Sequence, residues 1–398
     1  MSAFIQKLKR VKFKEFVQIW KLPVSLICVP FYRIKHKNLW IVCEDRNEAR
    51  DNGYWFFKYV CEKHPEQECV YAISPKSPDF KKISSIGPTV KFGSLKHWIV
   101  YLSSRKKIAS QKAGNPNAAI FYFLEVYGLL KDKRCFLGHG ITINDAKWLY
   151  YDVTKMSKFV CGAKPEYDFV NERFGYPSSS VIYTGLARFD GLHDFQVDKN
   201  MILIMPSWRE WIADEDSRLL EFEGTTNIAE TNYFVKWCEF LNSPVLKELS
   251  DKYGVKFLFF PHRNMQKYIE LFPKSRDYLE VADARKYDVQ DLMKRAPMMI
   301  TDYSSVFMDM VYMKKPVLFY QFDYERFRSC QYGEGYFDYR NNPFSKSFDE
   351  LDGLLGELET QISNRFSVSE EYEKAHKSFF QLYDCYNCQR IYDEVVGK

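Results

Sequence analysis

The sequence predicts an α/β protein with two successive domains, each built on a parallel sheet. At 398 residues the chain is long enough for two domains of ordinary size. Short apolar runs, typical of buried strands, alternate with amphipathic segments, typical of helices, along the whole length. A content of 46% hydrophobic and 27% charged residues is typical of a folded protein and excludes a disordered chain.

The strand candidates fall into two groups. Those of the first half are Leu39–Cys43, Cys69–Ile73, Lys107–Ser110, Cys135–Leu137, Phe159–Cys161 and Val181–Thr184. Those of the second half are Met201–Met205, Lys256–Phe260, Val281–Ala282, Met298–Thr301 and Val317–Phe319. Helical patterns lie between them at Tyr54–Lys63, Asn232–Lys252 and Asp291–Arg295. A polar stretch at Asp190–Asn200 separates the groups, so we expect domains at residues 38–190 and 191–398.

Residues 1–37 form a basic segment ahead of the first domain. They carry nine Lys or Arg and a single acid, Glu15, so their net charge is +8 and that of the remainder about −3. Apolar side chains, Trp20 among them, are interleaved with these bases. Such an amphipathic helix can lie on an anionic membrane surface, although it can also pack one face on the protein.

The same segment is not expected to cross a membrane. Its longest apolar stretch, Leu22–Tyr32, contains two prolines and is much shorter than the ~20 residues that a spanning helix needs. No small-residue cleavage site of a signal peptide follows it. We therefore expect a cytoplasmic protein held peripherally at the inner face of the cell membrane. The nearly neutral remainder offers no basic patch for nucleic acid.

Ligands of open α/β sheets bind beyond the carboxyl ends of the strands. In the first half, a dense polar loop at residues 44–54, which includes Asn52, follows one strand candidate. Gly138-His139-Gly140 follows another. The flanking glycines leave the imidazole open to a substrate, and histidine can accept a proton near neutral pH. The alternatives are a solvated loop and a structural histidine.

Three polar stretches follow strand candidates in the second half. Arg209 lies in Pro206–Arg209, and His262 and Arg263 follow the next strand candidate. A guanidinium group can bind phosphate through two parallel hydrogen bonds. Thr301–Ser305 leads from a strand into a helix, where free N–H groups and hydroxyls suit a phosphate, although an ordinary helix cap uses the same residues. The chain has no Walker-type loop and no dinucleotide-binding glycine pattern.

These motifs resemble those of the CDP-glycerol glycerophosphotransferase family, whose enzymes prime or polymerise wall teichoic acids and related capsule polymers. The specific part is Thr301–Ser305 with Asp309, followed by Lys315–Tyr320 with Asp323. Further motifs occur in the family's order at Gly138–Gly140, Thr184–Asp190, Pro206–Arg209, Asp291–Met293 and Gly335–Asp338. The resemblance extends from about Leu39 to the C-terminal helix.

The resemblance implies a GT-B-like fold, with two Rossmann-type domains and a cleft between them. It implies transfer of glycerol phosphate from CDP-glycerol to a hydroxyl of a lipid-linked teichoic acid or capsule-polymer acceptor, with release of CMP. The acceptor would belong to the first domain and the CDP donor to the second. Three alternatives stay open: a CDP-ribitol ribitolphosphotransferase, a GT-B glycosyltransferase that uses a nucleotide sugar, and a catalytically silent membrane scaffold. No oligomeric state is predicted.

The resemblance also assigns roles to individual residues. His139 would be the base that takes the proton from the acceptor hydroxyl, and His262 the second catalytic histidine. Donor phosphates would be held by Ser207, Arg209, Arg263, Thr301, Asp302, Ser304 and Ser305. The acceptor side would contain Asn52, Gly140 and Thr142. No cofactor and no metal is expected.

Two departures from the family pattern bear on the substrates. Ile141 stands between Gly140 and Thr142, where the family has threonine directly after its His-Gly pair. Pro261 precedes His262, whereas the family has proline after this histidine. The first departure leaves the role of Thr142 open, and both departures are compatible with a different acceptor or a ribitol-type donor.

Overall fold

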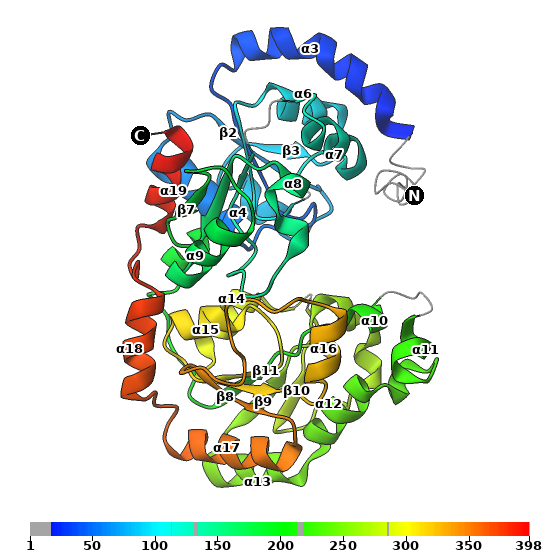
Figure 1. Cartoon of the computed structure of the whole chain (residues 1–398), viewed down its shortest axis with the longest axis vertical. Coiled ribbons are helices and arrows are strands. Elements are labelled where there is room, and N and C mark those ends of the chain that lie inside the picture. Colours follow the sequence, from blue (N-terminus) through cyan, green and yellow to red (C-terminus); the bar gives the residue numbers. More distant parts are fainter. Residues whose placement is uncertain (1–16, 113, 131–133, 214–217, 285, 398) are drawn as a thin grey trace. The chain divides into compact units, whose positions relative to one another are not determined.

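The computed structural model describes residues 17–112, 114–130, 134–213, 218–284 and 286–397 (Figure 1). The chain divides into two compact units. The first unit comprises the residues up to Ile141, Lys147–Gly191 and Asp384–Lys398. The second comprises Thr142–Ala146 and Leu192–Tyr383. Both are α/β, as the sequence predicts.

A parallel sheet forms the centre of the first unit. Within the described residues its seven strands follow the order β3-β2-β1-β4-β5-β6-β7. They are β1 (Trp40–Cys43), β2 (Cys69–Ile73), β3 (Thr89–Lys91), β4 (Lys106–Ala109), β5 (Arg134–Phe136), β6 (Lys158–Cys161) and β7 (Val181–Tyr183). Central strands such as β1 are buried along their whole length, which explains their continuous apolar sequence.

Helices cover both faces of this sheet, since each parallel strand needs a crossover connection. They are α4 (Asn52–Lys63), α5 (Phe80–Ser84), α6 (Leu95–Ser103), α7 (Ala118–Val126), η2 (Lys147–Leu149), α8 (Tyr151–Thr154), α9 (Lys164–Arg173), η3 (Ala187–Gly191) and α19 (Asn387–Val396).

The basic segment lies partly outside the described residues, which begin at Val17. From there, η1 (Val17–Trp20) leads into α3 (Lys21–Lys35), which runs beside α6 (Figure 1). Lys21 Nζ donates to Gly93 O at 2.7 Å, just before α6. Arg33 donates to Leu102 O at 2.6 Å, near the end of α6. Two of the predicted bases therefore bind the protein itself.

A second parallel sheet forms the centre of the second unit, in the order β10-β9-β8-β11-β12-β13 among the described residues. Its strands are β8 (Met201–Ile204), β9 (Lys256–Phe259), β10 (Leu279–Val281), β11 (Met299–Thr301), β12 (Val317–Tyr320) and β13 (Ser345–Phe348). Its helices are α10 (Glu210–Ala213), α11 (Arg218–Glu223), η4 (Ile228–Glu230), α12 (Asn232–Asn242), α13 (Pro244–Tyr253), η5 (Arg263–Leu271), α14 (Val289–Arg295), α15 (Phe307–Tyr312), α16 (Tyr324–Cys330), α17 (Leu351–Ser363) and α18 (Glu370–Phe379).

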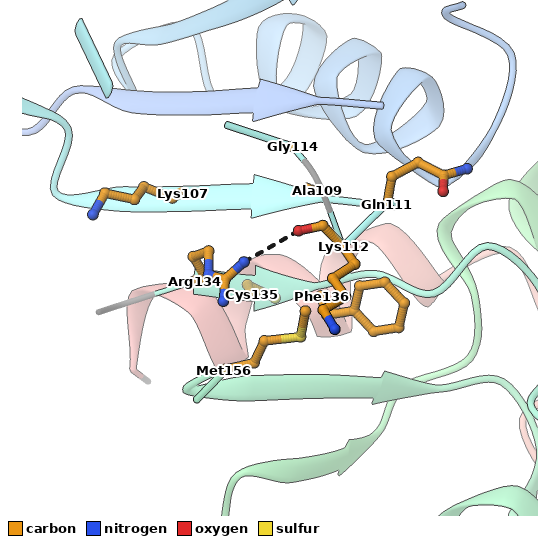
Figure 2. A pocket seen from close by; sticks show the side chains of 9 residues that line it. All are labelled: Lys107, Ala109, Gln111, Lys112, Gly114, Arg134, Cys135, Phe136 and Met156. Atoms are coloured by element: carbon orange, nitrogen blue, oxygen red, sulfur yellow. Dashed lines mark hydrogen bonds between the residues drawn. The ribbon is translucent and has the colours of Figure 1, made fainter. Parts of the chain in front are cut away.

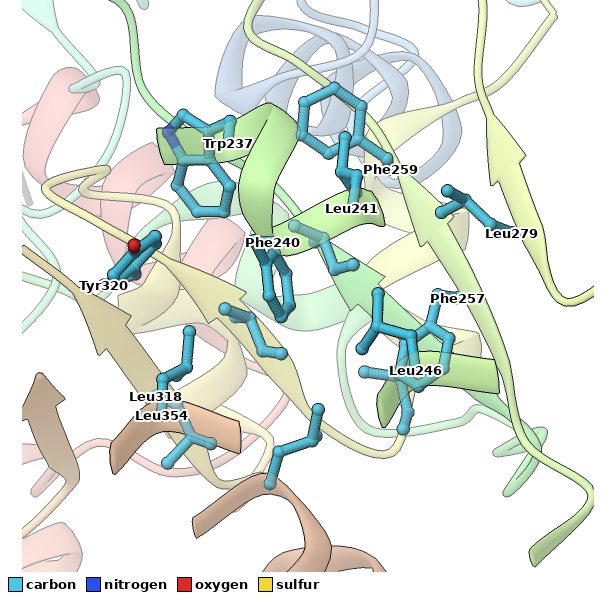
Figure 3. Close-up of a cluster of buried hydrophobic side chains, with 14 of the residues drawn as sticks. Trp237, Phe240, Leu241, Leu246, Phe257, Phe259, Leu279, Leu318, Tyr320 and Leu354 are labelled. Carbon is cyan, nitrogen blue, oxygen red and sulfur yellow. The ribbon is translucent and has the colours of Figure 1, made fainter. Parts of the chain in front are cut away.

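An aromatic-rich core holds the helices of the second unit to its sheet (Figure 3). Trp237 and Phe240 of α12 pack against Tyr320 of β12, and Trp237 also contacts Phe259 of β9. All four side chains are fully buried. Much of the chain's aromatic content in this unit is thus used for packing.

The last helix, α19, returns to the first unit and is tied to η3. Asp190 accepts hydrogen bonds from the main-chain N–H groups of Asn387 and Cys388 at 2.8 and 2.9 Å, so it caps the start of α19 from a distant part of the chain. Gly185 lets the two segments approach closely, because a Cβ there would lie 1.7 Å from Asn387 Oδ1. The first unit is therefore built from both ends of the described chain.

Several elements differ from the sequence prediction. The edge strands β3 and β13 were not predicted, because they are short and contain Lys with Thr or Ser rather than an apolar run. The helix predicted at Asn232–Lys252 is two helices, α12 and α13. Pro244 lacks an N–H group and begins α13, while the Ser243 side chain caps that helix.

The division of the chain also differs from the predicted boundaries. It falls between Gly191 and Leu192, but residues 384–398 return to the first unit. Thr142–Ala146 belongs to the second unit, although Thr142 was expected in the first domain. Asp145 there pairs with Gly333, and Asn144 accepts a hydrogen bond from Arg328 at 2.8 Å. Such pairings join residues that are far apart in the chain, so the local sequence pattern does not predict them.

Candidate active site

His139 lies at the carboxyl end of β5, whose neighbours in the sheet are β4 and β6. The preceding Gly138 has φ +74°, a conformation that glycine adopts without strain and that turns the chain sharply after the strand. The imidazole is 61% exposed, and its Nδ1 lies 2.6 Å from Oδ2 of Asp51. Among the described residues Nε2 has no hydrogen-bonding partner, so this nitrogen is open to a ligand.

Asp51 comes from the loop after β1, and its carboxylate bridges His139 and Arg188. Oδ1 accepts a hydrogen bond from Arg188 at 2.6 Å, while Oδ2 faces His139. Burial alone would raise the pKa of Asp51, but the charges and hydrogen bonds of His139 and Arg188 lower it. An ionised Asp51 favours the tautomer with the proton on Nδ1, which leaves Nε2 as the proton acceptor.

Arg188 and Asn52 fix the main chain around this pair. The Arg188 guanidinium group donates to His139 O at 2.8 Å, and the main-chain N–H group of Arg188 donates to Asn52 Oδ1 at 2.9 Å. Asn52 Nδ2 donates to Gly138 O at 2.8 Å. Asn52 is fully buried and binds main-chain groups with both side-chain atoms. The structure therefore gives it a supporting position rather than the acceptor-contacting one expected from sequence.

A small pocket lies next to His139, since Gln111 lines the pocket and also contacts His139. The Gln111 amide is 3.0 Å from His139 Nδ1. The pocket is lined by Lys107, Ala109, Gln111, Lys112, Gly114, Arg134, Cys135, Phe136 and Met156 (Figure 2). Its cavity volume is only about 10 Å³, whereas typical small-molecule sites enclose ~300–1,000 Å³, so this pocket is too small for a nucleotide or a polymer unit.

In the second unit, the three predicted polar stretches follow three neighbouring strands, β9, β8 and β11. Hydrogen bonds join them to one another. Thr301 Oγ1 donates to Met205 O at 2.6 Å, and the Ser207 N–H group donates to Asp302 Oδ1 at 2.7 Å. The His262 N–H group donates to Pro206 O. The sheet therefore brings these stretches together.

A sealed ion-pair network lies beneath this surface. The Arg209 side chain has no exposed area and donates to Asp302 at 2.9 Å and to both oxygens of Asp323, at 2.7 and 3.0 Å. Burial alone would lower the pKa of Arg209, but the two carboxylates raise it well above its usual value. The Tyr303 hydroxyl also donates to Asp323.

The predicted donor residues thus separate into two layers. Arg209, Thr301 and Asp302 are fully buried, and Ser207 is only 7% exposed. Arg209 was expected to bind phosphate directly, but in this structure its guanidinium group faces two carboxylates inside the unit. The layer that reaches the surface consists of Trp208, His262, Arg263, Ser304 and Ser305. The His262 ring is stacked at 6.2 Å from Trp208.

Sequence reasoning gave no role to Asp51, Arg188 or Asp323. Arg188 and Asp323 lie in motifs described above, and Asp51 lies in the polar loop at residues 44–54. The usable signal was the placement of opposite charges after neighbouring strands. That neighbour relation depends on the sheet order, which a single sequence does not give.

The chain thus consists of two parallel α/β units with polar strand ends, one bearing a histidine–aspartate pair and the other surface hydroxyls. Residues 139–397 match the family described as CDP-Glycerol:Poly(glycerophosphate) glycerophosphotransferase, and the chain belongs to this family. The resemblance predicted from the motifs is therefore confirmed.

Relatives and solved structures agree with this assignment. The minor teichoic acid biosynthesis protein GgaB of Bacillus subtilis (strain 168) is 30% identical over 376 residues, which cover 92% of this chain and 40% of GgaB. The teichoic acid poly(ribitol-phosphate) polymerase of Bacillus spizizenii is 23% identical over 245 residues, covering 56% and 35%. The chain thus spans less than half the length of these relatives.

The wall teichoic acid polymerase TagF has a similar fold. Its structure aligns with a TM-score of 0.64 at 15% identity and covers 97% of this chain and 98% of its own. At this identity the likeness establishes the fold, in agreement with the predicted pair of Rossmann-type domains.

Proposed function

We propose that this chain transfers glycerol phosphate from CDP-glycerol to a hydroxyl of a teichoic-acid-type acceptor and releases CMP. The observation that carries the proposal is the His139–Asp51 pair, at 2.6 Å, with Nε2 of the imidazole open. A carboxylate on one imidazole nitrogen prepares the other to accept a proton. Family membership supplies the reaction class in which such a base is needed.

In the proposed reaction the acceptor oxygen attacks the β-phosphorus of CDP-glycerol. Its proton passes to His139 Nε2, the new P–O bond forms, and the bond to CMP breaks. Asp51 holds the imidazole in the accepting tautomer and stabilises the imidazolium that results. Arg188 keeps Asp51 in place through the 2.6 Å hydrogen bond.

The donor diphosphate is assigned to the surface layer of the second unit. Ser304 and Ser305 lie in the turn that leads into α15, and their hydroxyls are half-buried rather than sealed. His262 and Arg263 can offset phosphate charge from the end of β9. The Arg209 network supports this layer by holding Asp302, and it leaves the phosphates to the surface residues.

CDP-ribitol is the second donor candidate, and the relatives favour testing it. Three of the curated relatives carry ribitol-phosphate polymerase names, at 23–25% identity. The two donors share CDP and differ by the length of the polyol. The same base and phosphate layer would serve both.

Donor choice can be tested by measuring nucleotide release. The purified chain is incubated with CDP-glycerol, CDP-ribitol or a set of nucleotide sugars, together with lipid-linked teichoic acid acceptors, and CMP or nucleoside diphosphate is quantified. We expect CMP from a CDP-polyol in the presence of acceptor. Two results would contradict the proposal: turnover only with nucleotide sugars, and no turnover with any of the donors.

We also propose that α3 lies on an anionic membrane surface, where a lipid-linked acceptor would be found. Trp20, Val24, Ile27, Phe31 and Ile34 recur at helical spacing, and all are exposed, the last three at 70–72%. The opposite face buries Ser25 and Val29 in the first unit. An exposed apolar stripe beside basic residues is typical of helices that lie in a membrane interface. In the described residues no helix is long and apolar enough to cross a membrane.

Vesicle co-sedimentation tests the role of α3. We expect the chain to bind vesicles with anionic lipids, and the triple substitution Ile27→Ser, Phe31→Ser and Ile34→Ser to abolish that binding. The control substitutes two exposed apolar residues of the second unit, Val235 and Leu271, by serine. Equal binding by both variants would contradict the proposal.

A further inference from the structure

Asp51 occupies the N-cap position of α4 but does not cap the helix. An aspartate at this position usually accepts a hydrogen bond from the N–H group two or three residues later. Here the Asp51 side chain accepts no such bond, and its carboxylate faces His139 and Arg188 instead. The start of α4 must then find another acceptor, because its first N–H groups have none within the helix.

Glu44 supplies that acceptor. It follows the last residue of β1 and is only 3% exposed. One carboxylate oxygen accepts the N–H groups of Asp51 at 3.0 Å and of Tyr54 at 2.6 Å, and the other accepts that of Arg50 at 2.9 Å. The bond from Tyr54 is the one that an N-cap side chain would normally receive.

Gly53 leaves room for this buried carboxylate. A Cβ at position 53 would lie 2.7 Å from Glu44 Cγ and 3.1 Å from its Oε1. The first distance is shorter than packed Cβ atoms show, and the second is tighter than most of their contacts, so Glu44 would have to shift. Gly53 is otherwise an unfavourable residue inside a helix, by ~1 kcal/mol relative to alanine.

We propose that Glu44 is a positioning residue for the transfer reaction: it caps α4 in place of Asp51 and so frees Asp51 to orient His139. This role rests on the proposed function, in which His139 is the base. Burial and the neighbouring Asp51 carboxylate raise the pKa of Glu44, against the effect of its three N–H donors. A buried carboxylate beside a second carboxylate is electrostatically unfavourable, which fits a group that orients Asp51 rather than one that stabilises the fold.

The proposal predicts a specific dependence between two substitutions. Without Glu44, the Asp51 carboxylate becomes the best available cap for α4 and turns away from His139. Glu44→Ala should therefore lower kcat by ~10–100-fold, since misplacing a catalytic group by about 1 Å has effects of this size. In an Asp51→Ala background the same substitution should change kcat by less than about twofold, because Glu44 acts through Asp51.

The experiment measures kcat and the donor KM for the four members of this cycle. The donor KM should stay constant, since the predicted phosphate residues lie in the second unit. Glu44→Gln, which keeps an oxygen for Asp51 and Tyr54, should restore part of kcat. An equal loss of kcat in both backgrounds, or no loss in either, overturns the proposal.

Gly53→Ala should displace Glu44 without changing any charge. This variant tests the proposal even if Glu44→Ala does not fold. It should lower kcat in the same way. Its matched control is Gly356→Ala in α17, another helical glycine, where a Cβ meets nothing within 4 Å. Equal kcat values for the two alanine variants overturn the proposal.

A spectroscopic readout separates this proposal from the proposed function. The proton shared by His139 Nδ1 and Asp51 should give a downfield proton resonance in the intact chain. It should be lost in Glu44→Ala and Gly53→Ala and kept in Gly356→Ala. A wild-type chain that releases no CMP contradicts the function, while the resonance still decides the role of Glu44: its survival in both variants overturns that role.

Discussion

The two units place charged groups at their strand ends in opposite ways. In the first unit the imidazole of His139 is 61% exposed, and its supports, Asp51 and Arg188, lie beneath it. In the second unit the charges of Arg209 and Asp302 are entirely sealed, and hydroxyls reach the surface. A base must exchange protons with a substrate, whereas a binding surface for phosphate needs a rigid foundation. The comparison agrees with the proposed roles, in which the first unit holds the base and the second unit binds the donor phosphates.

The largest effect is expected from removing the base. His139→Ala should lower kcat by ~10²–10⁴-fold, the usual contribution of a general base. Binding of CDP-glycerol, measured by calorimetry, should be unchanged because the phosphate layer is in the second unit. A variant that keeps its full rate, or one that loses donor binding, would break the comparison.

The next effect concerns the sealed network. Arg209→Met keeps an apolar side chain but leaves two buried carboxylates without their cation, which should cost ~3–5 kcal/mol of unfolding free energy in urea titrations. Arg263→Met, at an exposed position, should change stability by less than ~0.5 kcal/mol. It should instead weaken donor binding. If Arg263→Met lowered stability and Arg209→Met only weakened donor binding, the assignment of the buried and surface layers would be wrong.

A third test concerns a buried histidine of the first unit. His97 is fully buried, accepts a hydrogen bond from the Gly93 N–H group at 3.0 Å, and lies near the charge of Lys21. Burial, with Lys21 adding to it, lowers the pKa of His97 to about 3. Below its ordinary pKa of ~6.5, the unfolded chain therefore binds a proton that the folded chain does not.

The His97 contribution to stability is thus intact above pH ~6.5 and declines toward pH 3, by about 2 kcal/mol at pH 5. His97→Asn keeps an acceptor for Gly93 but does not titrate. Urea unfolding at pH 7 and pH 5 should show a smaller loss for this variant than for the wild type. Identical losses would mean that His97 is protonated in the folded chain.

The smallest effect is expected at the phosphate surface. Ser304→Ala or Ser305→Ala should each weaken CDP-glycerol binding by ~3–10-fold, the value of a single hydrogen bond. Ser207→Ala is the matched control, because its hydroxyl is buried and has no partner among the described residues. A larger effect at Ser207 than at Ser304 would move the donor site inward.

The sequence predicted the strand ends well because apolar runs and the polar residues after them are local features. His139, His262 and Thr301–Ser305 follow strands in the structure as expected. Burial of Arg209 and Asn52 was not predictable, since each binds partners more than 80 positions away. The partner of His139 was missed for the same reason: Asp51 is 88 positions distant.

The return of α19 to the first unit has a consequence for biosynthesis. Domains generally fold as they emerge from the ribosome, the N-terminal one first. Here Asp190 and Gly185 receive their partners only when Asn387 has been made, so the unit that carries His139 begins to form first but receives α19 only after the second unit has been made. During synthesis the second unit would therefore be complete before the first unit had received α19.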